Sequence, residues 1–272
     1  MTTIKIGNVE VVQLLDLEFA FPYNVFFPNV PAESWSPYKG IYPDSSRDEE
    51  FVTNAQCYVL RSSGQTFLVD TGLGPNPPFG GAGNLLADMN AKGVSPDSVD
   101  TVVFTHLHVD HVGWNIQDGK PVFPNARYLA PEADWKLFGS AAERDNNPHI
   151  AAQVEPLEEL GCLELTDGEL TLTTELTAVP TPGHTPGHQS IAISSGGERA
   201  FIAGDVSHHP AQAQETEWNA GFDGDPAASA ATRKRVMEAL EAEGGVAVFC
   251  HYPAPGFGRI TRDSGRRVFR AL

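Results

Sequence analysis

Short apolar runs that lead directly into a polar, metal-binding type of residue recur five times along the chain. Each run is rich in β-branched and apolar residues, and such runs predict buried strands of a layered α/β sheet. Strand ends that meet at one edge of a sheet form a natural site for a ligand. The five runs are Gln65–Val69 into Asp70, Asp100–Thr105 into His106, Leu176–Pro180 into the loop of His184, Ala200–Gly204 into Asp205, and Val246–Cys250 into His251.

Helical segments are predicted between these runs. The clearest covers residues 226–243, where Asp225 can cap the first turn and Gly244 can end the helix. Shorter helices are predicted over residues 83–92 and 131–138. The long helix has a candidate buried face made of Val236, Met237 and Leu240.

Residues 19–50 are predicted to be irregular, although they carry an unusual number of aromatic side chains. Such a segment can pack as ordinary core, form a dimer contact, or wall an apolar pocket beside the strand ends. The sequence leaves these possibilities open, and Trp114, Trp218 and Phe222 are further candidates for a pocket wall. The aromatic residues of the segment are Phe19, Phe21, Tyr23, Phe26, Phe27, Trp35, Tyr38 and Tyr42.

The length and the charge of the chain narrow the class of protein. With 272 residues, of which 41% are hydrophobic, the chain can bury a sizeable core, and a single α/β domain over residues 1–272 is predicted. The formal net charge of −17 would repel a phosphate backbone or an anionic membrane. A small molecule is therefore the expected partner, rather than nucleic acid or membrane.

The N-terminus and the cysteines indicate a cellular compartment. The first residues lack the basic start and apolar run of an export signal, and no stretch approaches the roughly 20 apolar residues of a membrane span. Three widely separated cysteines, Cys57, Cys162 and Cys250, do not resemble a disulfide framework. A cytoplasmic protein is predicted.

The strongest chemical signal is a cluster of donors after the second strand run. His106, His108, Asp110 and His111 place four potential ligands within six positions that contain no Lys or Arg. His106 and His108 are two apart at the end of an extended run, so their rings can project to the same side. Imidazole and carboxylate donors of this kind favour zinc, and the spacing differs from the helical HExxH arrangement.

This cluster, followed by Thr181-Pro182-Gly183-His184, Gly204-Asp205 and His251, resembles the metallo-β-lactamase superfamily over about residues 52–262. Within it, the runs Gly183–Ser190 and His251–Ile260 are similar to the branch that contains acyl-homoserine lactonases and methyl parathion hydrolase. The resemblance is specific for the fold and for metals and much less specific for a substrate.

The resemblance implies an α/β fold, a four-layer αββα sandwich with the metal site along one edge. It also implies two divalent metal ions. Zinc is the first expectation because of the histidine-rich donors, and iron or manganese are alternatives. The implied ligands are His106, His108 and His184 for the first ion, Asp110, His111 and His251 for the second, and Asp205 as a bridge.

Four nearby residues are expected to lie outside the ligand set. Asp70 matches a superfamily residue that supports the metal-binding loop, or it is simply a strand-end turn residue. His188 is expected to have a supporting role, and His149 to be a surface histidine. Cys250 precedes His251 in a predicted strand, so its side chain should point to the opposite face, into the core.

The expected activity is hydrolysis by a hydroxide that bridges the two metals, with a lactone or carboxylic ester as substrate. A phosphotriester hydrolase and a β-lactamase-like amide hydrolase are alternatives with the same site. Asp110 can carry a proton to the leaving group. A non-hydrolytic metal protein is a further, less favoured class.

His208, three residues after Asp205, stands where many acyl-homoserine lactonases have a tyrosine that assists the substrate carbonyl. This departure weakens a specific homoserine-lactone assignment and is similar to the methyl parathion hydrolase side of the branch. His208 is thus either a hydrogen-bond donor to substrate or a structural residue. His209 has no assigned role. A moderately hydrophobic substrate and a homodimer are both compatible with the aromatic segment.

Overall fold

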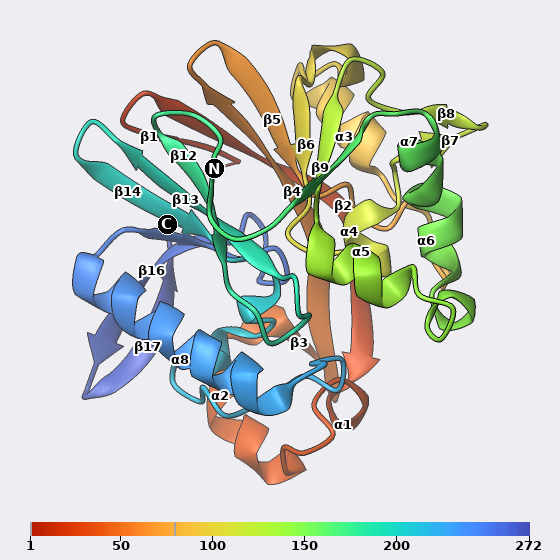
Figure 1. The fold of residues 1–272 in the computed structure, drawn as a ribbon. Helices are drawn as coiled ribbons and strands as arrows, with labels where there is room; N and C mark the ends of the chain where they lie inside the picture. The colour runs from red at the N-terminus through yellow and green to blue at the C-terminus, as the bar shows by residue number, and fades with distance from the viewer. Residues whose placement is uncertain (1, 79) are drawn as a thin grey trace.

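The computed structural model describes residues 2–78 and 80–272 as two facing β-sheets with helices on their outer sides (Figure 1). In the described residues the first sheet has the strand order β1-β2-β4-β5-β6-β9-β10, with β3 paired to β4. Its strands are β1 (Thr3–Ile6), β2 (Val9–Pro22), β3 (Ser46–Arg47), β4 (Glu50–Ser62), β5 (Gln65–Val69), β6 (Thr101–Val103), β9 (Arg127–Pro131) and β10 (Leu163–Thr166).

The second sheet follows the chain order from β11 to β17. Its strands are β11 (Leu170–Thr171), β12 (Leu176–Pro180), β13 (Gln189–Ser195), β14 (Glu198–Ile202), β15 (Val246–Val248), β16 (Phe257–Asp263) and β17 (Arg266–Ala271). A separate small ribbon pairs β7 (Ile116–Gln117) with β8 (Lys120–Pro121).

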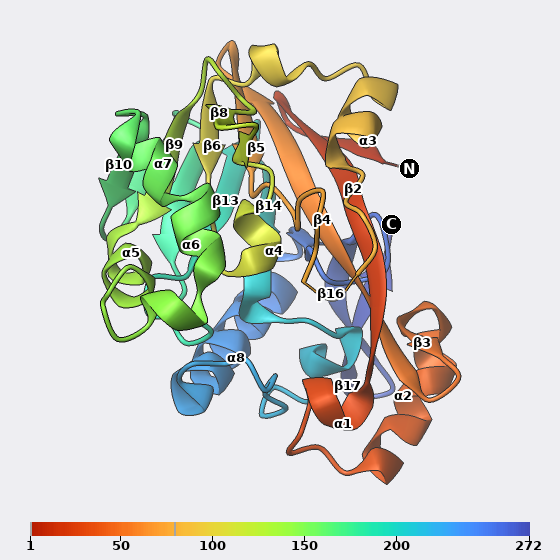
Figure 2. The same cartoon turned by 90° about the vertical axis from the view of Figure 1, so that its right-hand side faces the viewer.

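Most helices are short and lie outside the sheets (Figures 1 and 2). They are α1 (Tyr23–Phe26), α2 (Ser36–Ile41), α3 (Leu85–Ala91), α4 (Val109–Val112), α5 (Glu132–Phe138), α6 (Pro148–Gln153), α7 (Glu155–Glu159) and α8 (Pro226–Glu243). The 3₁₀ turns are η1 (Ala32–Trp35), η2 (Pro43–Ser45), η3 (Pro96–Ser98), η4 (Arg144–Asn146), η5 (Gly204–Val206) and η6 (Pro210–Ala213). None of the helices in the described ranges has the length and apolar character that a membrane crossing requires.

Strand alternation divides the apolar side chains between the layers. On β6, Val102 belongs to the outer cluster beneath α3 and α6, whereas Val103 faces the cluster between the two sheets. Opposite faces of one strand therefore serve two different cores. A third cluster lies between the second sheet and α8, where Val236, Met237 and Leu240 pack. The four-layer αββα arrangement that the sequence predicted is confirmed.

The long helix α8 forms where the sequence predicted it. Asp225 caps its first turn by accepting a hydrogen bond from the backbone N–H of Ala228 at 3.0 Å. Gly244 ends the helix in a left-handed conformation, with φ of 65°. The two shorter predictions are confirmed with tighter bounds, because the helices cover Leu85–Ala91 and Glu132–Phe138.

The aromatic segment is less irregular than expected. Phe19 and Phe21 belong to the long strand β2, which pairs with β4 as far as Pro22↔Glu50. Short helices follow, and most of the aromatic side chains bury one another in a separate cluster. These aromatic residues therefore mainly pack the segment against the edge of the sheet. The buried members are Tyr23, Phe26, Phe27, Val30, Trp35, Tyr38, Phe51, Ala211 and Ala220.

Two chain segments cross closely where the first sheet meets α4. A Cβ atom on Gly113 would lie 2.1 Å from the carbonyl carbon of Leu73, although Gly113 itself has right-handed helical angles. The backbone N–H of Gly113 also donates to the carbonyl of Gly72 at 2.7 Å. This contact joins the turn after β5 to the end of the His106–His111 segment, so a side chain at residue 113 would separate them.

We expect Gly113→Ala to lower the free energy of unfolding by about 1–3 kcal/mol, because the added methyl overpacks a backbone contact. Gly40→Ala is the matched control, since Gly40 lies in helix α2 with open space around its Cα. That variant should be as stable as wild type or more stable by up to about 1 kcal/mol, because alanine favours a helix over glycine. Urea denaturation of the three proteins measures the difference, and equal stability of Gly113→Ala and wild type would contradict the steric argument.

Candidate metal centre

The cluster His106 to His111 lies where β6 leaves the first sheet. The strand ends at Val103, His108 is the residue before helix α4, and Asp110 and His111 lie in the helix itself. A turn of helix directly after an extended segment brings side chains from both conformations to the same end of the sheet.

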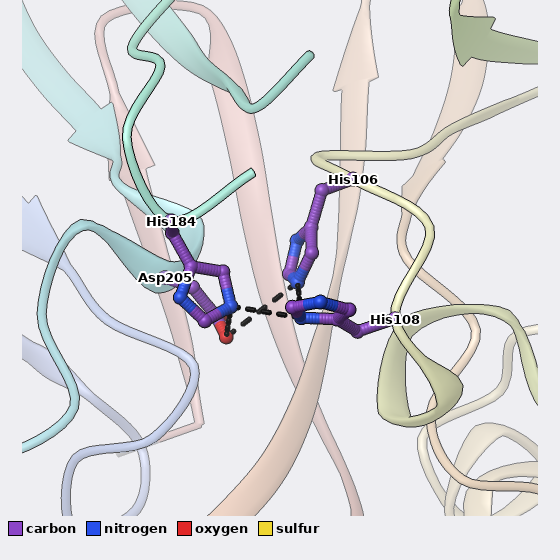
Figure 3. Close-up of side chains that lie close together, drawn as sticks. All are labelled: His106, His108, His184 and Asp205. Atoms are coloured by element: carbon purple, nitrogen blue, oxygen red, sulfur yellow. Dashed lines mark hydrogen bonds and ion pairs between the residues drawn. The ribbon is translucent and has the colours of Figure 1, made fainter. Parts of the chain in front are cut away.

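The remaining candidates come from the second sheet. His184 lies in the loop after β12, Asp205 in η5 after β14, and His251 three residues after the end of β15. The structure therefore brings together the seven side chains that the sequence singled out. Figure 3 shows His106 and His108 entering from one side and His184 and Asp205 from the other.

One group of donors surrounds the Oδ2 atom of Asp205. His184 Nε2 lies 3.1 Å and His106 Nε2 3.6 Å from that oxygen. His108 Nδ1 lies 3.0 Å from His106 Nε2 and 2.9 Å from His184 Nε2. Donor atoms around a tetrahedral zinc ion, each about 2.0 Å from the metal, stand roughly 3.3 Å apart. The four distances between the donor atoms of this group, from 2.9 to 3.6 Å, are close to that value.

A second group surrounds the other oxygen, Oδ1, of Asp205. His251 Nε2 lies 3.1 Å and His111 Nε2 3.2 Å from it. Asp110 Oδ2 lies 3.6 Å from both of these ring nitrogens. The Nε2 atom of His111 is buried and forms no hydrogen bond of acceptable geometry, so its lone pair is directed into this group. The two groups thus share Asp205 through different oxygens.

The electrostatics of the cluster centre on Asp205. Burial acts to raise the pKa of its carboxyl, but the surrounding imidazoles, His251 foremost, hold that pKa well below its usual value. Burial lowers the pKa of an imidazole, yet the charge of Asp205 outweighs burial at His111, His251 and His184 and raises the pKa, to about 9 for His184. At His106 burial dominates and the pKa is well below its usual value.

All ion pairs of Asp205 within the described residues are with histidines. A buried carboxylate without a permanent cation is costly, and divalent ions supply the missing charge. The donor types, their separations and the charge of the site therefore fit two divalent metal ions.

Other side chains fix the rings from behind. His111 Nδ1 lies 2.8 Å from Asp70 Oδ2, and the same carboxylate accepts from the backbone N–H of Thr105 at 2.7 Å. His251 Nδ1 donates to the carbonyl of Asn54 at 2.7 Å, and His184 Nδ1 lies 2.8 Å from Asp223 Oδ1. Such contacts select the tautomer whose Nε2 lone pair points at the metal position.

His188 also lies behind the donors. Its Nε2 accepts from the backbone N–H of Asp205 at 2.9 Å, so it holds the backbone of the shared carboxylate. Burial lowers the pKa of His188 to about 3, so the ring is neutral and can accept that hydrogen bond. The supporting role predicted for this residue agrees with the geometry.

Sequence reasoning missed two residues that tie the donor loops together. Asp134, at the start of α5, is buried and accepts from the Leu107 backbone at 3.2 Å and from Thr185 Oγ1 at 2.8 Å. His149 was expected at the surface, but it is half-buried and donates from Nε2 to the Leu107 carbonyl at 2.9 Å. Both contacts span long sequence separations, which no local pattern reveals.

The expectation for Cys250 was confirmed in part: its side chain is buried in the apolar cluster between the sheets, but it does not point away from the site. Its Sγ lies 3.3 Å from Asp205 Oδ1, and it belongs to the group of potential donors formed with His111 and His251. Strand β15 ends at Val248, so the alternation of faces that would turn Cys250 away from His251 no longer holds at these residues.

The sequence signature of the metallo-β-lactamase superfamily matches residues 51–251, which is most of the chain. The chain is a member of the metallo-β-lactamase superfamily. The match begins within β4 and ends at His251, so it includes all seven residues of the centre.

Several proteins of the superfamily are similar to this chain. N-acyl homoserine lactonase of Bacillus sp is 25% identical over 234 residues, which are 78% of this chain and 84% of that protein. N-acyl homoserine lactonase AiiA of Bacillus thuringiensis subsp. kurstaki is 24% identical over 235 residues, again 78% and 84% of the two chains. The structure of AidC, a dizinc quorum-quenching lactonase, superposes with a TM-score of 0.84 at 23% identity, over 99% of this chain and 96% of that one. The hydrolase AbOPH gives a TM-score of 0.85 at 23% identity, with the same coverage.

His209, which had no role assigned from its place in the sequence, lies outside the metal centre. Its Nδ1 accepts from the Ala211 backbone at 2.9 Å and thereby caps η6. Its ring packs among aromatic residues, with centroids 4.9 Å from Trp35 and 5.3 Å from Phe51. Burial lowers its pKa from 6.5 to about 3, so the ring stays neutral in the folded protein.

His209 should make this superfamily member less stable in acid. As the pH falls below about 6.5, the unfolded chain binds a proton that the folded His209 cannot accept, so stability is lost between that pH and about 3. From pH 7 to pH 5 we expect this residue to account for about 2 kcal/mol of the loss. His209→Asn retains an acceptor for the cap. Its free energy of unfolding should therefore fall less steeply with acid than that of wild type.

Phe27→Leu serves as the control for this measurement, because it weakens the same aromatic cluster without removing a titratable group. It should lower stability by a similar amount at every pH. An unchanged pH dependence in His209→Asn would contradict the assignment.

Proposed function

We propose that the protein is a dinuclear metal-dependent hydrolase that cleaves a lactone or a carboxylic ester of a moderately hydrophobic small molecule. The observation that carries the proposal is the arrangement of two donor groups on opposite oxygens of one buried carboxylate, Asp205. Membership of the superfamily and the lactonases among the similar proteins support it.

The proposed ligands divide by the oxygen that they face. His106, His108 and His184 hold the first ion, and Asp110, His111 and His251 hold the second, with Asp205 shared between them. Five imidazoles and two carboxylates favour zinc, while iron and manganese are alternatives. The dizinc centre of AidC supports zinc as the first choice.

The bound metals supply a water that ionises near neutral pH, at a pKa of about 7, and polarise the carbonyl oxygen of the substrate. The protein supplies the proton path. Asp110 is one of the two partly exposed members of the centre, with 19% of its side chain accessible, and its Oδ2 lies 3.6 Å from His111 Nε2. In the proposed reaction Asp110 accepts a proton at this oxygen and returns it to the leaving alkoxide.

His208 is the proposed donor to the substrate carbonyl. Its Nε2 lies 3.2 Å from Asp205 Oδ2, at the same side of the centre as His184. Burial lowers the pKa of His208 to about 4, so the ring is neutral at physiological pH and has one N–H to donate. Its Nδ1 is buried without a hydrogen-bond partner in the described part of the chain, so the single N–H is at Nε2, the nitrogen that faces Asp205.

An apolar surface lies beside His208. The ring of Phe26 is 5.3 Å from that of His208, and Phe222 packs on Phe26 at 5.4 Å. Phe222 is 52% exposed, which is unusual for an aromatic side chain next to a polar centre. We propose that Phe222 contacts the apolar part of the substrate, with Phe26 buried beneath it as part of the aromatic core.

A phosphotriester hydrolase is the second candidate. It is favoured by His208, because the resemblance to acyl-homoserine lactonases leads one to expect a tyrosine at this position. Amide hydrolysis of the β-lactamase kind uses the same donors. Membership of the superfamily and the lactonase relatives disfavour a non-hydrolytic metal protein. The homodimer and the cytoplasmic localisation stay predictions.

Metal content and turnover on one sample test the proposal. We expect about two zinc equivalents per chain by elemental analysis and measurable hydrolysis of a medium-chain lactone or an aryl ester, with slower hydrolysis of an aryl phosphotriester. Chelation should abolish the activity and added Zn²⁺ should restore it. A protein that binds no metal and remains inactive after zinc or manganese is added would overturn the proposed function.

Asp205→Asn is the matched variant for that experiment. An amide preserves the shape of the side chain but removes the charge on which both donor groups depend. Metal content and activity should therefore fall together. Full activity with only one metal lost would mean that Asp205 is not shared.

His208→Phe should keep about two metals and lower kcat roughly 100-fold, because the ring shape remains and one donor to the developing oxyanion is lost. His209→Asn is the control, since His209 faces the aromatic cluster and should leave kcat unchanged. A wild-type kcat in His208→Phe would assign His208 a purely structural role.

A further inference from the structure

A buried ion pair lies behind the first metal position and has no part in the ligand set. Arg233 of α8 is 0% exposed, and its Nη2 lies 3.2 Å from Oδ2 of Asp223, which is also buried. Removing two charges from water costs several kcal/mol per ion. Such a pair is therefore weak evidence for stability alone, and its contacts indicate a more specific role.

Every N–H group of the Arg233 guanidinium faces an acceptor. Nε donates to the carbonyl of Val206 at 2.8 Å, which is the residue after Asp205. Nη2 also donates to Ser229 Oγ at 2.9 Å. Nη1 contacts the loop before Asp223, at Thr216 O, Trp218 O and Asn219 Oδ1, over distances of 2.8, 3.1 and 3.1 Å. One side chain thus joins the Asp205 turn to the loop that carries Asp223.

Asp223 connects this guanidinium to a proposed ligand. Its Oδ1 accepts from His184 Nδ1 at 2.8 Å, while His184 Nε2 faces Asp205 Oδ2 at 3.1 Å. The carboxylate thereby fixes both the tautomer and the rotation of the imidazole. The path from Val206 to His184 runs through Arg233 and Asp223. It therefore connects two of the three donors that the second sheet provides, Asp205 and His184.

The loop that carries His184 is also attached to helix α8 and to the residues just before it. The backbone N–H of Gly224 donates to the His184 carbonyl at 2.9 Å, and Thr232 Oγ1 donates to the Pro182 carbonyl at 2.7 Å. Gly183 lies so close to the helix that a Cβ atom would be 2.4 Å from the Ser229 nitrogen. The loop and helix α8 therefore form one unit, with Arg233 inside it.

We propose that Asp223 and Arg233 are positioning residues that set the metal affinity of the first site, the one formed by His106, His108 and His184, by holding His184 at a fixed place relative to Asp205. The inference rests on the proposed function, since it concerns the same metal centre. Neither residue touches a metal or the substrate in this arrangement.

The effect should be confined to the first site. The second-site donors are oriented by different groups, because His111 contacts Asp70 and His251 contacts the Asn54 carbonyl. Neither of these contacts includes α8. A general loss of structure would instead weaken both sites together.

The test titrates metal-free wild type, Asp223→Asn, Asp223→Ala and Arg233→Lys with Zn²⁺ in competition with a chromogenic chelator, and records the visible spectrum of the Co²⁺ forms. His184→Ala and His251→Ala provide the reference spectra for loss of the first and the second site. Arg235→Lys is the matched control, because Arg235 is exposed on the same helix. Thermal unfolding of each metal-free variant reports whether it is folded.

We expect one of the two binding steps to weaken by about 10- to 100-fold in the variants of Asp223 and Arg233, more in Asp223→Ala than in Asp223→Asn. The Co²⁺ spectra of these variants should lack the component that is also missing in His184→Ala. They should retain the component that is missing in His251→Ala. Arg235→Lys should bind both ions like wild type. If Arg233→Lys does not fold, the two Asp223 variants decide the matter.

Wild-type affinity for both ions in folded Asp223→Ala would overturn the inference, and so would an equal loss at both sites. These outcomes differ from failure of the proposed function, in which the wild-type protein itself would bind no metal.

Discussion

The buried carboxylate of Asp205 is the constraint on which the arrangement of the site depends. It lies between the two sheets' edges with its pKa held low by imidazoles, and no lysine or arginine in the described residues pairs with it. A charge in that position needs other charges within a few ångströms. The fold meets this need by directing five histidine rings from separate strand ends toward the two oxygens.

The two sheets divide the work of holding these rings. The first sheet supplies His106, His108, Asp110 and His111, the last of which is held by Asp70. The second sheet supplies His184, Asp205 and His251. The centre exists only when the sheets are packed face to face, because neither half contains a complete donor group. Packing of the apolar layer between the sheets and assembly of the metal site are therefore coupled in this fold.

Much of this arrangement could be predicted from the sequence because the signals are local. A strand run that ends on a histidine, and a helix with Asp225 before it and Gly244 after it, are encoded within a few residues of where they act. The donors could be grouped because their order and spacing resemble a known superfamily. The assignment of fold and candidate ligands thus required no knowledge of long-range contacts.

Supporting roles were expected for Asp70 and His188, but other supporting residues could not be predicted, since they act across the chain. Asp134 holds the loop of Leu107, and Asp223 holds His184, over separations that carry no periodic pattern. Cys250 was misplaced because the end of a short strand was set two residues too late. Arg233 did have a signal, because it shares the face of α8 on which Val236 and Leu240 are buried. A charged residue on an apolar helix face indicates an internal partner.

The same part of the fold connects the metals to the substrate surface. Arg233 holds the loop of residues 216–223, which carries Phe222, and the Asp205 turn leads directly into His208, on which Phe26 packs. Phe222 is exposed, whereas Phe26 is buried in the aromatic cluster and packs on His208. In the proposed arrangement, a change in the guanidinium reaches the first metal site through Asp223 and His184. A change at the exposed Phe222 would instead alter the proposed substrate surface while the buried network behind it stays constant.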